Sequence, residues 1–533
     1  MTVDGFVVSN FVGTDALNSV NLLQPFVLIM SVVPAILASG VNFVLPKAFG
    51  TGSEEAVKKI FTATAYLTVV FVIGSLILQF PISYLMISGY TVEPEMKQMM
   101  NLYAVGLIIS NSVTVINMVC SYILIASGQA KSQLKLSILE SVLNLALDLL
   151  FVPACGLGVL GAGLGTAVSC TVRAIVSPIL VQRLFKVFPL KRVDCKKEKR
   201  EILSTGAPAA VSSLTLSVMG YIMSLVVTRF GGLEAVTVLS VCGIGGSFTS
   251  IVANSFVQAG NAMIGILAGS EEWKTARDVN RRISVMCVTA VTGLVLLIVL
   301  FPQMLFGFYK VGDYTDFQVL SVRLYMVKYI AFACTACLSN MCVFCEKKSA
   351  TAITGILKAL LLVPTFLVLG WMNRSLYFLS YFICEAVPVC YLFPVLEKAL
   401  QNLTEEEEKS SRIHFSFRGS ESIDISKKLH DYLRLHDVPE KLAYRLALLC
   451  EEIGSYAGNG KADEDPCIFL SIRKSEDSVL VFYLDDGVPA ILNKKLKATN
   501  LIIGNYNLIE SMAEKFTYQN VGGMNNFIVK FRL

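Results

Sequence analysis

Polar residues inside long apolar segments are the residues of this chain most capable of chemistry. Asp4 lies in the apolar stretch "MTVDGFVVSNFVG" at 1–13, and Asn144 and Asp148 are four residues apart in "SVLNLALDLLFV". That spacing places Asn144 and Asp148 on one face of a helix. Thr166 begins the polar side of the following apolar segment. An ionisable group within a bilayer is costly and normally faces a cavity, has a partner and marks a pathway.

The composition places these residues in a membrane. The chain has 533 residues, of which 54% are hydrophobic and 16% are charged, which is too apolar for a soluble enzyme of several domains. Successive apolar runs have the length of about 20 residues that a helix needs to cross a bilayer. Residues 1–13 form only a fragment of a first span, which would need roughly 15 to 20 more apolar residues ahead of Met1. We predict complete spans at 18–46, 60–88, 99–126, 134–153, 156–184, 207–229, 233–268, 282–309, 320–344, 351–371 and 375–396.

The basic residues between these spans predict the orientation of the chain. Short cytoplasmic loops are enriched in Lys and Arg. Alternate loops are basic here, whereas the opposite loops hold little beyond Lys97, Lys310 and Arg374. We therefore expect a multi-pass protein of the plasma membrane with both termini in the cytoplasm. The basic loops carry Lys47, Lys58, Lys59, Lys131, Lys135, the 183–201 bridge, Lys274, Arg277, Arg281, Arg282, Lys347 and Lys348.

An internal repeat relates the two halves of the membrane region. The segment "NFVGTDALNSV" at 10–20 lies 219 residues before "RFGGLEAVTVL" at 229–239, and the same offset pairs Gly50 with Gly269. Repeated blocks with an even number of crossings keep the same topology, so the halves should be parallel lobes related by an axis along the membrane normal. We expect an α-helical polytopic membrane protein with two pseudo-symmetric six-helix lobes, the first helix truncated. Such an architecture is typical of transporters.

Several motifs in this order resemble those of the multidrug and toxic compound extrusion (MATE) transporters. They are "DGFV" at 4–7 with Gly13 and Ala16-Leu17 after it, the "GSEEA" loop, "SGQAKSQ", and "GLGVLGAGLGTAVS". The similarity covers roughly residues 1–398. It implies a first lobe at 1–190 and a second lobe at 191–398.

The resemblance also implies a cation site in the first lobe. One prokaryotic subgroup of the family builds this site from an Asp in the first span, an Asn and an Asp in the fifth, and a Thr in the sixth. Asp4, Asn144, Asp148 and Thr166 match these positions. Two carboxylates that face one cavity repel each other when both are ionised, and a bound proton or Na⁺ relieves that repulsion. An oxygen-rich set of ligands suits a hard cation. Alternatively, Asp148 hydrogen-bonds within the bundle and Asp4 is a solvated chain end.

Other polar positions have two interpretations. Asn254, Gln258 and Asn261 share one helical face, which either lines a substrate cavity or bridges helices. The charged residues Glu140, Arg173, Lys358 and Glu385 also fall in or near spans, as internal ion pairs or as side chains that reach the interface.

Four cysteines in the segment 334–345 have a spacing that resembles a zinc site. They are Cys334, Cys337, Cys342 and Cys345. On one continuous helix they form a stripe, which cannot surround a metal tetrahedrally. We therefore predict no metal site there and explain these residues as small side chains at a packing face.

The chain beyond the membrane region has a different composition. Residues 399–412 include "TEEEEK" and are predicted to form an acidic linker, and 413–533 (the tail) have the mixed helix and strand pattern of a small cytoplasmic α/β domain. Its order of helix, hairpin, "DDGVP", helix and strands resembles the GHKL ATP-binding fold, in particular anti-sigma-factor kinases. In that family the Asp of a D-x-G element contacts adenine, which matches Asp485 and Gly487. As an alternative, this element is an ordinary acidic turn.

The catalytic part of that resemblance is incomplete. The family has a Glu followed four positions later by an Asn that holds Mg²⁺, whereas Glu452 is followed by Tyr456 here. The glycine-rich lid is reduced to Gly504. Phosphoryl transfer needs a metal ion and a closed phosphate site, so these departures argue against binding of ATP and Mg²⁺ and more strongly against their turnover.

Together these features predict a transporter and not an enzyme. The expected function is a cation-coupled antiporter, driven by H⁺ or Na⁺ and needing no other cofactor, that exports amphipathic, cationic small molecules. The tail is expected to regulate it by binding a cytoplasmic protein, and no nucleic acid partner is expected. The alternatives are a lipid-linked oligosaccharide flippase or a transport-dead sensor of the same superfamily. A flippase of pyrophosphate lipids would favour a cationic cavity, whereas Asp4 and Asp148 are acidic.

Overall fold

The computed structural model describes most of the chain as long helices followed by a small sheet. The described residues are 4, 7–8, 11–13, 16, 19–20, 22–51, 53–89, 93–127, 129–185, 194–308, 314–409, 412–435, 438–458, 467–474, 478–485, 514–521 and 524–532. Within them, eleven helices are long and apolar enough to cross a membrane. This number agrees with the eleven complete spans predicted from the sequence.

The helices of the membrane region are continuous apolar segments bounded by helix-breaking residues. Gly158 and Gly232, for example, adopt positive φ angles of 55° and 73° at the start of two of them, a conformation that glycine adopts without strain. The elements are α3 Gln24–Met30, α4 Val32–Gly50, α5 Glu54–Gly89, α6 Pro94–Ala126, α7 Ala130–Leu149, η1 Leu150–Ala154, α8 Gly158–Phe185, α9 Lys196–Val226, η2 Val227–Gly231, α10 Gly232–Gly269, α11 Trp273–Leu300, α12 Gln303–Phe308, α13 Asp316–Phe344, α14 Lys348–Met372, η3 Arg374–Leu376 and α15 Leu379–Lys409.

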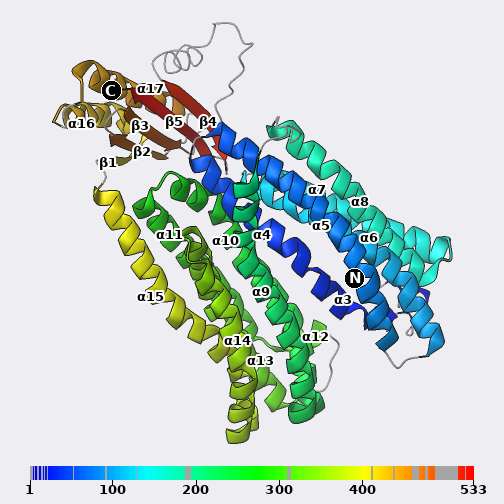
Figure 1. Ribbon diagram of the computed structural model, residues 1–533. Helices are drawn as coiled ribbons and strands as arrows, with labels where there is room; N and C mark the ends of the chain where they lie inside the picture. The colour runs from blue at the N-terminus through cyan, green and yellow to red at the C-terminus, as the bar shows by residue number, and fades with distance from the viewer. Residues whose placement is uncertain are drawn as a thin grey trace.

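The long helices form two groups. Figure 1 shows α5 to α8 on one side and α9 to α15 on the other, with α3 and α4 running between them. The two groups lie closest together at the end next to the tail and are farther apart at the opposite end (Figure 1). The protein is therefore a helical polytopic membrane protein in which the two halves of the sequence pack as separate bundles.

Glycine residues allow the two halves to touch through their backbones. A Cβ atom on Gly50 of α4 would lie 2.0 Å from the carbonyl oxygen of Ile266 on α10, and one on Gly269 would lie 2.0 Å from that of Lys47. Close backbone approach of this kind requires small residues at helix interfaces. Lys47 and Ile266 are separated by the same 219 residues as Gly50 and Gly269. The contact is thus reciprocal, as expected where a twofold axis relates the two halves.

The tail is an antiparallel sheet with helices on one face. The strand order is β1-β2-β3-β5-β4, and the predicted hairpin is present as β2 paired with β3. The helical segment and the closing strands predicted in the tail correspond to α16, α17, β4 and β5, whereas the helix predicted after "DDGVP" lies outside the described residues. The elements are β1 Arg412–Arg418, η4 Gly419–Glu421, α16 Ser422–Leu435, α17 Glu440–Gly458, β2 Cys467–Lys474, β3 Ser478–Asp485, β4 Lys515–Val521 and β5 Met524–Arg532.

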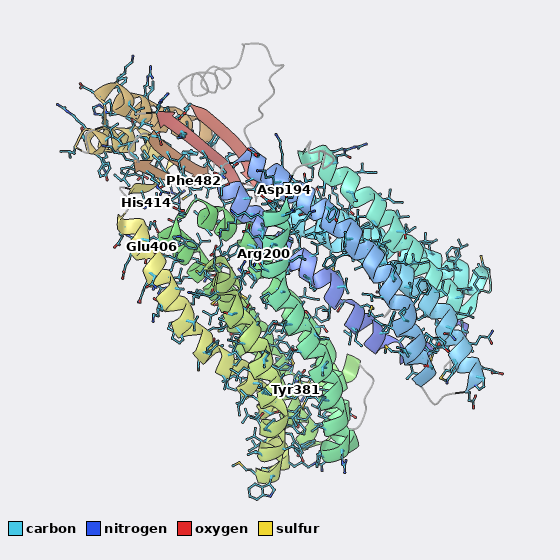
Figure 2. The ribbon with its side chains drawn as sticks, in the orientation of Figure 1. Asp194, Arg200, Tyr381, Glu406, His414 and Phe482 are labelled. Carbon is cyan, nitrogen blue, oxygen red and sulfur yellow. The ribbon has the colours of Figure 1, made fainter. Side chains whose placement is uncertain are left out.

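Both faces of this sheet are covered. Along β3, Val479, Val481 and Tyr483 pack with α16 and α17. Phe482 and Leu484, which alternate with them, belong instead to the apolar core that includes residues of the membrane helices. Side chains alternate between the two faces of a strand, so one face of the sheet serves the tail itself and the other rests on the transporter. Figure 2 shows Phe482 at this junction.

The predicted acidic linker is largely helical in the structure. Residues 399–409 form the last turns of α15, and Glu407 within them is buried. Most of the predicted linker is thus part of α15. Gly487, Gly504 and the side chain of Glu452 lie outside the described residues.

The reciprocal glycine contact predicts a specific sensitivity. Gly269→Ala should lower the melting temperature of the purified protein, because its methyl group must push α10 away from α4. Overpacking of this kind costs about 1–3 kcal/mol. Gly293→Ala in α11 is the matched control, since nothing lies within 4 Å of its added Cβ. Equal melting temperatures for wild type and Gly269→Ala would contradict the prediction.

Candidate functional site

The first lobe contains a buried polar cluster around Asp4. The hydroxyl groups of Tyr103 on α6 and Thr166 on α8 each donate a hydrogen bond of 2.8 Å to Oδ2 of Asp4. Nδ2 of Asn144 on α7 donates to the hydroxyl oxygen of Thr166 at 3.1 Å. Asp4 is completely buried. The structure therefore connects three of the four residues predicted from the sequence, through contacts between four different helical segments.

Asp148, the fourth predicted residue, lies beside this cluster. It ends α7 just before the π-helical turn η1, and its side chain is completely buried. Its carboxylate occupies the space left by Gly165, where a Cβ atom would lie 2.3 Å from Oδ1. Among the described residues, no donor hydrogen-bonds either of its carboxylate oxygens. Its charge interacts with that of Asp4.

This pair of carboxylates is asymmetric in a way that suits reversible binding. Asp4 accepts hydrogen bonds from two hydroxyl groups, which stabilise its ionised form. Asp148 is buried without such donors, so its ionised form is costly unless it takes up a proton or contacts a cation. The oxygen atoms of Asp4, Asp148 and Thr166 and the amide of Asn144 are the groups that could surround a hard cation.

Tyr103 was missed in the sequence analysis. Nothing in its type or spacing separates it from the aromatic residues that simply pack within apolar spans. Its approach to Asp4 depends on a close helix contact, because a Cβ on the neighbouring Gly106 would lie 2.1 Å from the carbonyl oxygen of Gly163 on α8. Only the packing of α6 against α8 reveals its role.

The charged residues predicted within the spans form two ion pairs. Arg173 on α8 pairs with Glu140 on α7 and also donates to the hydroxyl of Ser121 at 2.7 Å. In the second lobe, Lys358 on α14 pairs with Glu385 on α15 at 2.6 Å. These pairs satisfy the first interpretation given above, that of internal salt bridges.

A cavity of about 260 Å³ lies where the second lobe faces α4. Asn254 of α10 lines it, together with Ser39 and Phe43 of α4 and Lys358 of α14. The other two residues predicted for a substrate cavity, Gln258 and Asn261, are not among its lining residues, and Asn261 is buried. Only one residue of the predicted polar face therefore reaches this cavity.

A histidine joins the tail to the second lobe. His414 of β1 lies between Glu272, in the turn before α11, and Glu407 of α15, with Nδ1 3.0 Å and Nε2 3.3 Å from their carboxylate oxygens. Ser471 of β2 donates to Glu272 at 2.5 Å, and Arg473 pairs with Glu271 at 2.8 Å. His414 lies at the boundary of the tail in Figure 2.

Glu272, Glu407 and His414 are also close enough together to hold a metal ion, with one potential ligand atom from each lying within 4.8 Å of the others. Among the described residues, no other group of His, Cys, Asp and Glu side chains meets this criterion. The carboxylates, however, contact opposite ring nitrogens. A metal ion would bind a single nitrogen, whereas a doubly protonated imidazole donates from both. The adjacent carboxylates of Glu272 and Glu407 raise the pKa of His414 from 6.5 to about 9. The arrangement therefore fits a charged imidazolium at neutral pH.

Asp485 is the last residue of strand β3 in the tail. Its side chain is buried, and Nδ2 of Asn525 on β5 donates to its Oδ1 at 2.8 Å. The carboxylate that the resemblance to GHKL proteins implies for adenine recognition is thus hydrogen-bonded within the sheet.

Comparisons with known proteins place this geometry in context. A family model described as MatE matches residues 1–150. The outward-facing form of a multidrug resistance MATE transporter of the MOP superfamily superposes with a TM-score of 0.68 at 18% identity, over 76% of this chain and 92% of that one. The chain has the MATE transporter fold. No curated protein matches the sequence.

Two further solved structures share the MATE fold. A MOP superfamily transporter from Pyrococcus furiosus, described as having a binding pocket of reverse polarity, gives a TM-score of 0.67 at 18% identity over 76% of this chain and 92% of its own. A mutant of the Vibrio cholerae MATE transporter VcmN gives 0.66 at 17% identity over 75% and 92%. These matches cover about the length of the membrane helices.

The position of His414 between Glu272 and Glu407 predicts that docking of the tail on the second lobe depends on pH. Because the pKa of His414 in the docked form lies above its ordinary value, the stabilisation is complete below pH 6.5 and is lost as the pH rises through about 9. Proteinase K should therefore cleave the tail of the purified full-length protein faster at pH 10 than at pH 7. His414→Gln should show rapid cleavage already at pH 7 and no step near pH 9.

His430→Gln is the matched control for this experiment. His430 lies on α16, and its nearest carboxylate is that of the adjacent Asp431. This variant should keep the pH profile of the wild type. A profile that is the same in wild type and in His414→Gln would rule out the imidazolium contact as the cause.

Proposed function

We propose that this protein is an ion-coupled exporter of amphipathic small molecules, located in the plasma membrane with its tail in the cytoplasm. The observation that carries the proposal is the buried pair Asp4 and Asp148 in the first lobe, with only Asp4 held by hydroxyl donors. Buried carboxylates in a membrane helix bundle are characteristic of proton and cation pathways. The MATE transporter fold supports the same class of function.

The coupling mechanism follows from the asymmetry of the two acids. When a proton or Na⁺ binds between them, it removes the repulsion of two buried negative charges. The occupied and empty sites therefore favour different helix packings around α7 and α8. Ion entry from outside then drives export, provided that ion and substrate favour opposite states of the transporter. The coupling ion is either H⁺ or Na⁺.

The test is dye efflux in inverted membrane vesicles, with a pH gradient and a Na⁺ gradient imposed separately. Asp148→Asn keeps the size of the side chain but removes its titratable charge, so coupled transport should fall at least roughly tenfold, within the range of typical coupling energies. Asp278→Asn changes the same residue type on an exposed face of α11 and should transport normally. Full coupled efflux by a well-expressed Asp148→Asn protein would refute the proposed role of this residue.

For the tail we propose a regulatory function without ATP turnover. The support is that Asp485 is engaged by Asn525, and that Glu452 is followed by Tyr456 where GHKL proteins carry the Asn that holds Mg²⁺. The outer faces of α16 and α17 are then the surface available to a cytoplasmic partner protein. In this function the tail reports to, or acts on, the second lobe through β1 and β2.

Calorimetry and phosphate release with Mg-ATP on the purified full-length protein test this proposal. We expect no hydrolysis above that of a protein-free control, because the residue that would hold the metal is missing. Phosphate release that disappears in Glu452→Ala would show instead that the tail is a working ATPase. Weak binding without turnover that is lost in Asp485→Ala would identify a nucleotide sensor.

A further inference from the structure

The second lobe contains a lysine enclosed by three tyrosines. Nζ of Lys328 on α13 lies 4.0 Å from the ring centre of Tyr325, 4.9 Å from that of Tyr329 and 4.8 Å from that of Tyr381. It also donates a hydrogen bond of 2.8 Å to the hydroxyl of Tyr325. A cation this close to several ring faces is stabilised by their electron density. Figure 2 places Tyr381 in the part of the second lobe away from the tail.

The aromatic side chains around Lys328 are held in place by their surroundings. The rings of Tyr325 and Tyr381 pack with their centres 4.8 Å apart, and both side chains are buried. The hydroxyl of Tyr329 fits against Gly246 of α10, where a Cβ atom would lie 2.0 Å away. The ammonium group is therefore positioned by a preformed site and is not a flexible side chain that reaches the membrane surface.

The charges in this region do not balance. Lys328, Lys358 and Glu385 line one cavity of about 230 Å³. Glu385 is paired with Lys358 at 2.6 Å, and both side chains are largely buried. Within the described residues, no carboxylate lies within salt-bridge distance of Lys328. Two lysines and one glutamate leave a net positive charge at a depth where an unpaired charge is costly.

The cavity is also lined by apolar residues, and it adjoins a second cavity. Met219 and Met223 of α9 and Leu362 of α14 line it together with the charged residues. Gly355 and Lys358 line both this cavity and the one of about 260 Å³ that faces α4. Small-molecule sites typically measure roughly 300–1,000 Å³ and combine apolar walls with a few fixed polar groups. The adjoining cavities have this character.

We propose that the Lys328 site binds the anionic group, a carboxylate or a phosphate, of an amphipathic substrate whose apolar part extends along Met219 and Met223. The inference rests on the proposed transport function and refines its substrate class. In place of the amphipathic, cationic substrate expected from the sequence, it assigns an amphipathic molecule with an acidic group, either a soluble amphiphile or the head group of a lipid. A bound anion completes the salt bridge that Lys328 lacks in the cavity.

Binding to the purified full-length protein in nanodiscs of zwitterionic lipid tests the inference. Three probes carry the same fluorescent amphiphile and end in a carboxylate, a primary amide or an amine, and fluorescence polarisation gives their affinities. The carboxylate probe should bind at least about tenfold more tightly than the amide probe, since charge-assisted hydrogen bonds are the stronger ones. Lys328→Met should abolish this preference, and Lys328→Arg should keep most of it. Lys135→Met, an exposed lysine on α7, should leave it unchanged.

Glu385→Gln provides an independent direction of change. It removes the partner of Lys358 and makes the cavity more positive, so the carboxylate probe should bind more tightly. Phosphatidic acid in the nanodisc distinguishes the two sources of the anion. If this lipid displaces the probe, the anion is a lipid head group. If the lipid does not displace the probe, the substrate is a soluble molecule.

Equal affinities for the three probes, tightest binding of the amine probe, or an unchanged preference in a folded Lys328→Met protein would overturn the inference. These measurements need no ion gradient. A failure of Asp148-dependent efflux with an intact carboxylate preference would therefore count against the proposed transport function alone.

Discussion

The backbone contact between α4 and α10 is the constraint around which the two halves of this protein are arranged. Gly50 and Gly269 each face a carbonyl group of the opposite helix, so any side chain there would separate the halves. The contact joins the last residues of α4 and α10, and Lys47 and Gly269 line a cavity together with Arg473 of the tail. Each half places the same pair of positions at the contact, so the contact is symmetric between the two halves.

The two halves differ in the charge they bury. The first lobe holds Asp4 and Asp148 near Tyr103 and Thr166, whereas the second lobe holds Lys328 within a ring of tyrosines. Under the proposed function, a cation and an anionic group are thus received by opposite halves of one molecule. Each ligand changes the charge of only its own half, while α4 contacts both α9 and α10 of the second half through close backbone approaches at Gly40 and Gly50.

The sequence predicted local features well and tertiary ones less completely. The spacing of Asn144 and Asp148 predicted a shared helical face, and the hairpin of the tail followed from strand alternation. The grouping of Asp4 with Thr166 came from a family resemblance and not from spacing, because contacts between distant segments are not encoded in local periodicity. Tyr103 and Lys328 were missed for the same reason. Lys328 lies in the interior of α13, and its setting becomes evident only when the three tyrosines, two of them close in sequence and one from α15, are placed around it.

The covered sheet of the tail also constrains the order in which the chain assembles. Phe482, Leu484 and Ile528 complete a core whose other members, such as Trp273 and Leu400, are synthesised earlier and inserted with the membrane helices. The apolar face of the sheet forms only when β3 and β5 have been synthesised and have paired. By then the membrane helices that it packs against have already been synthesised. A tail separated from its helices would expose that face to water and tend to self-associate. The membrane region thus acts as the template on which the last part of the polypeptide finds its place.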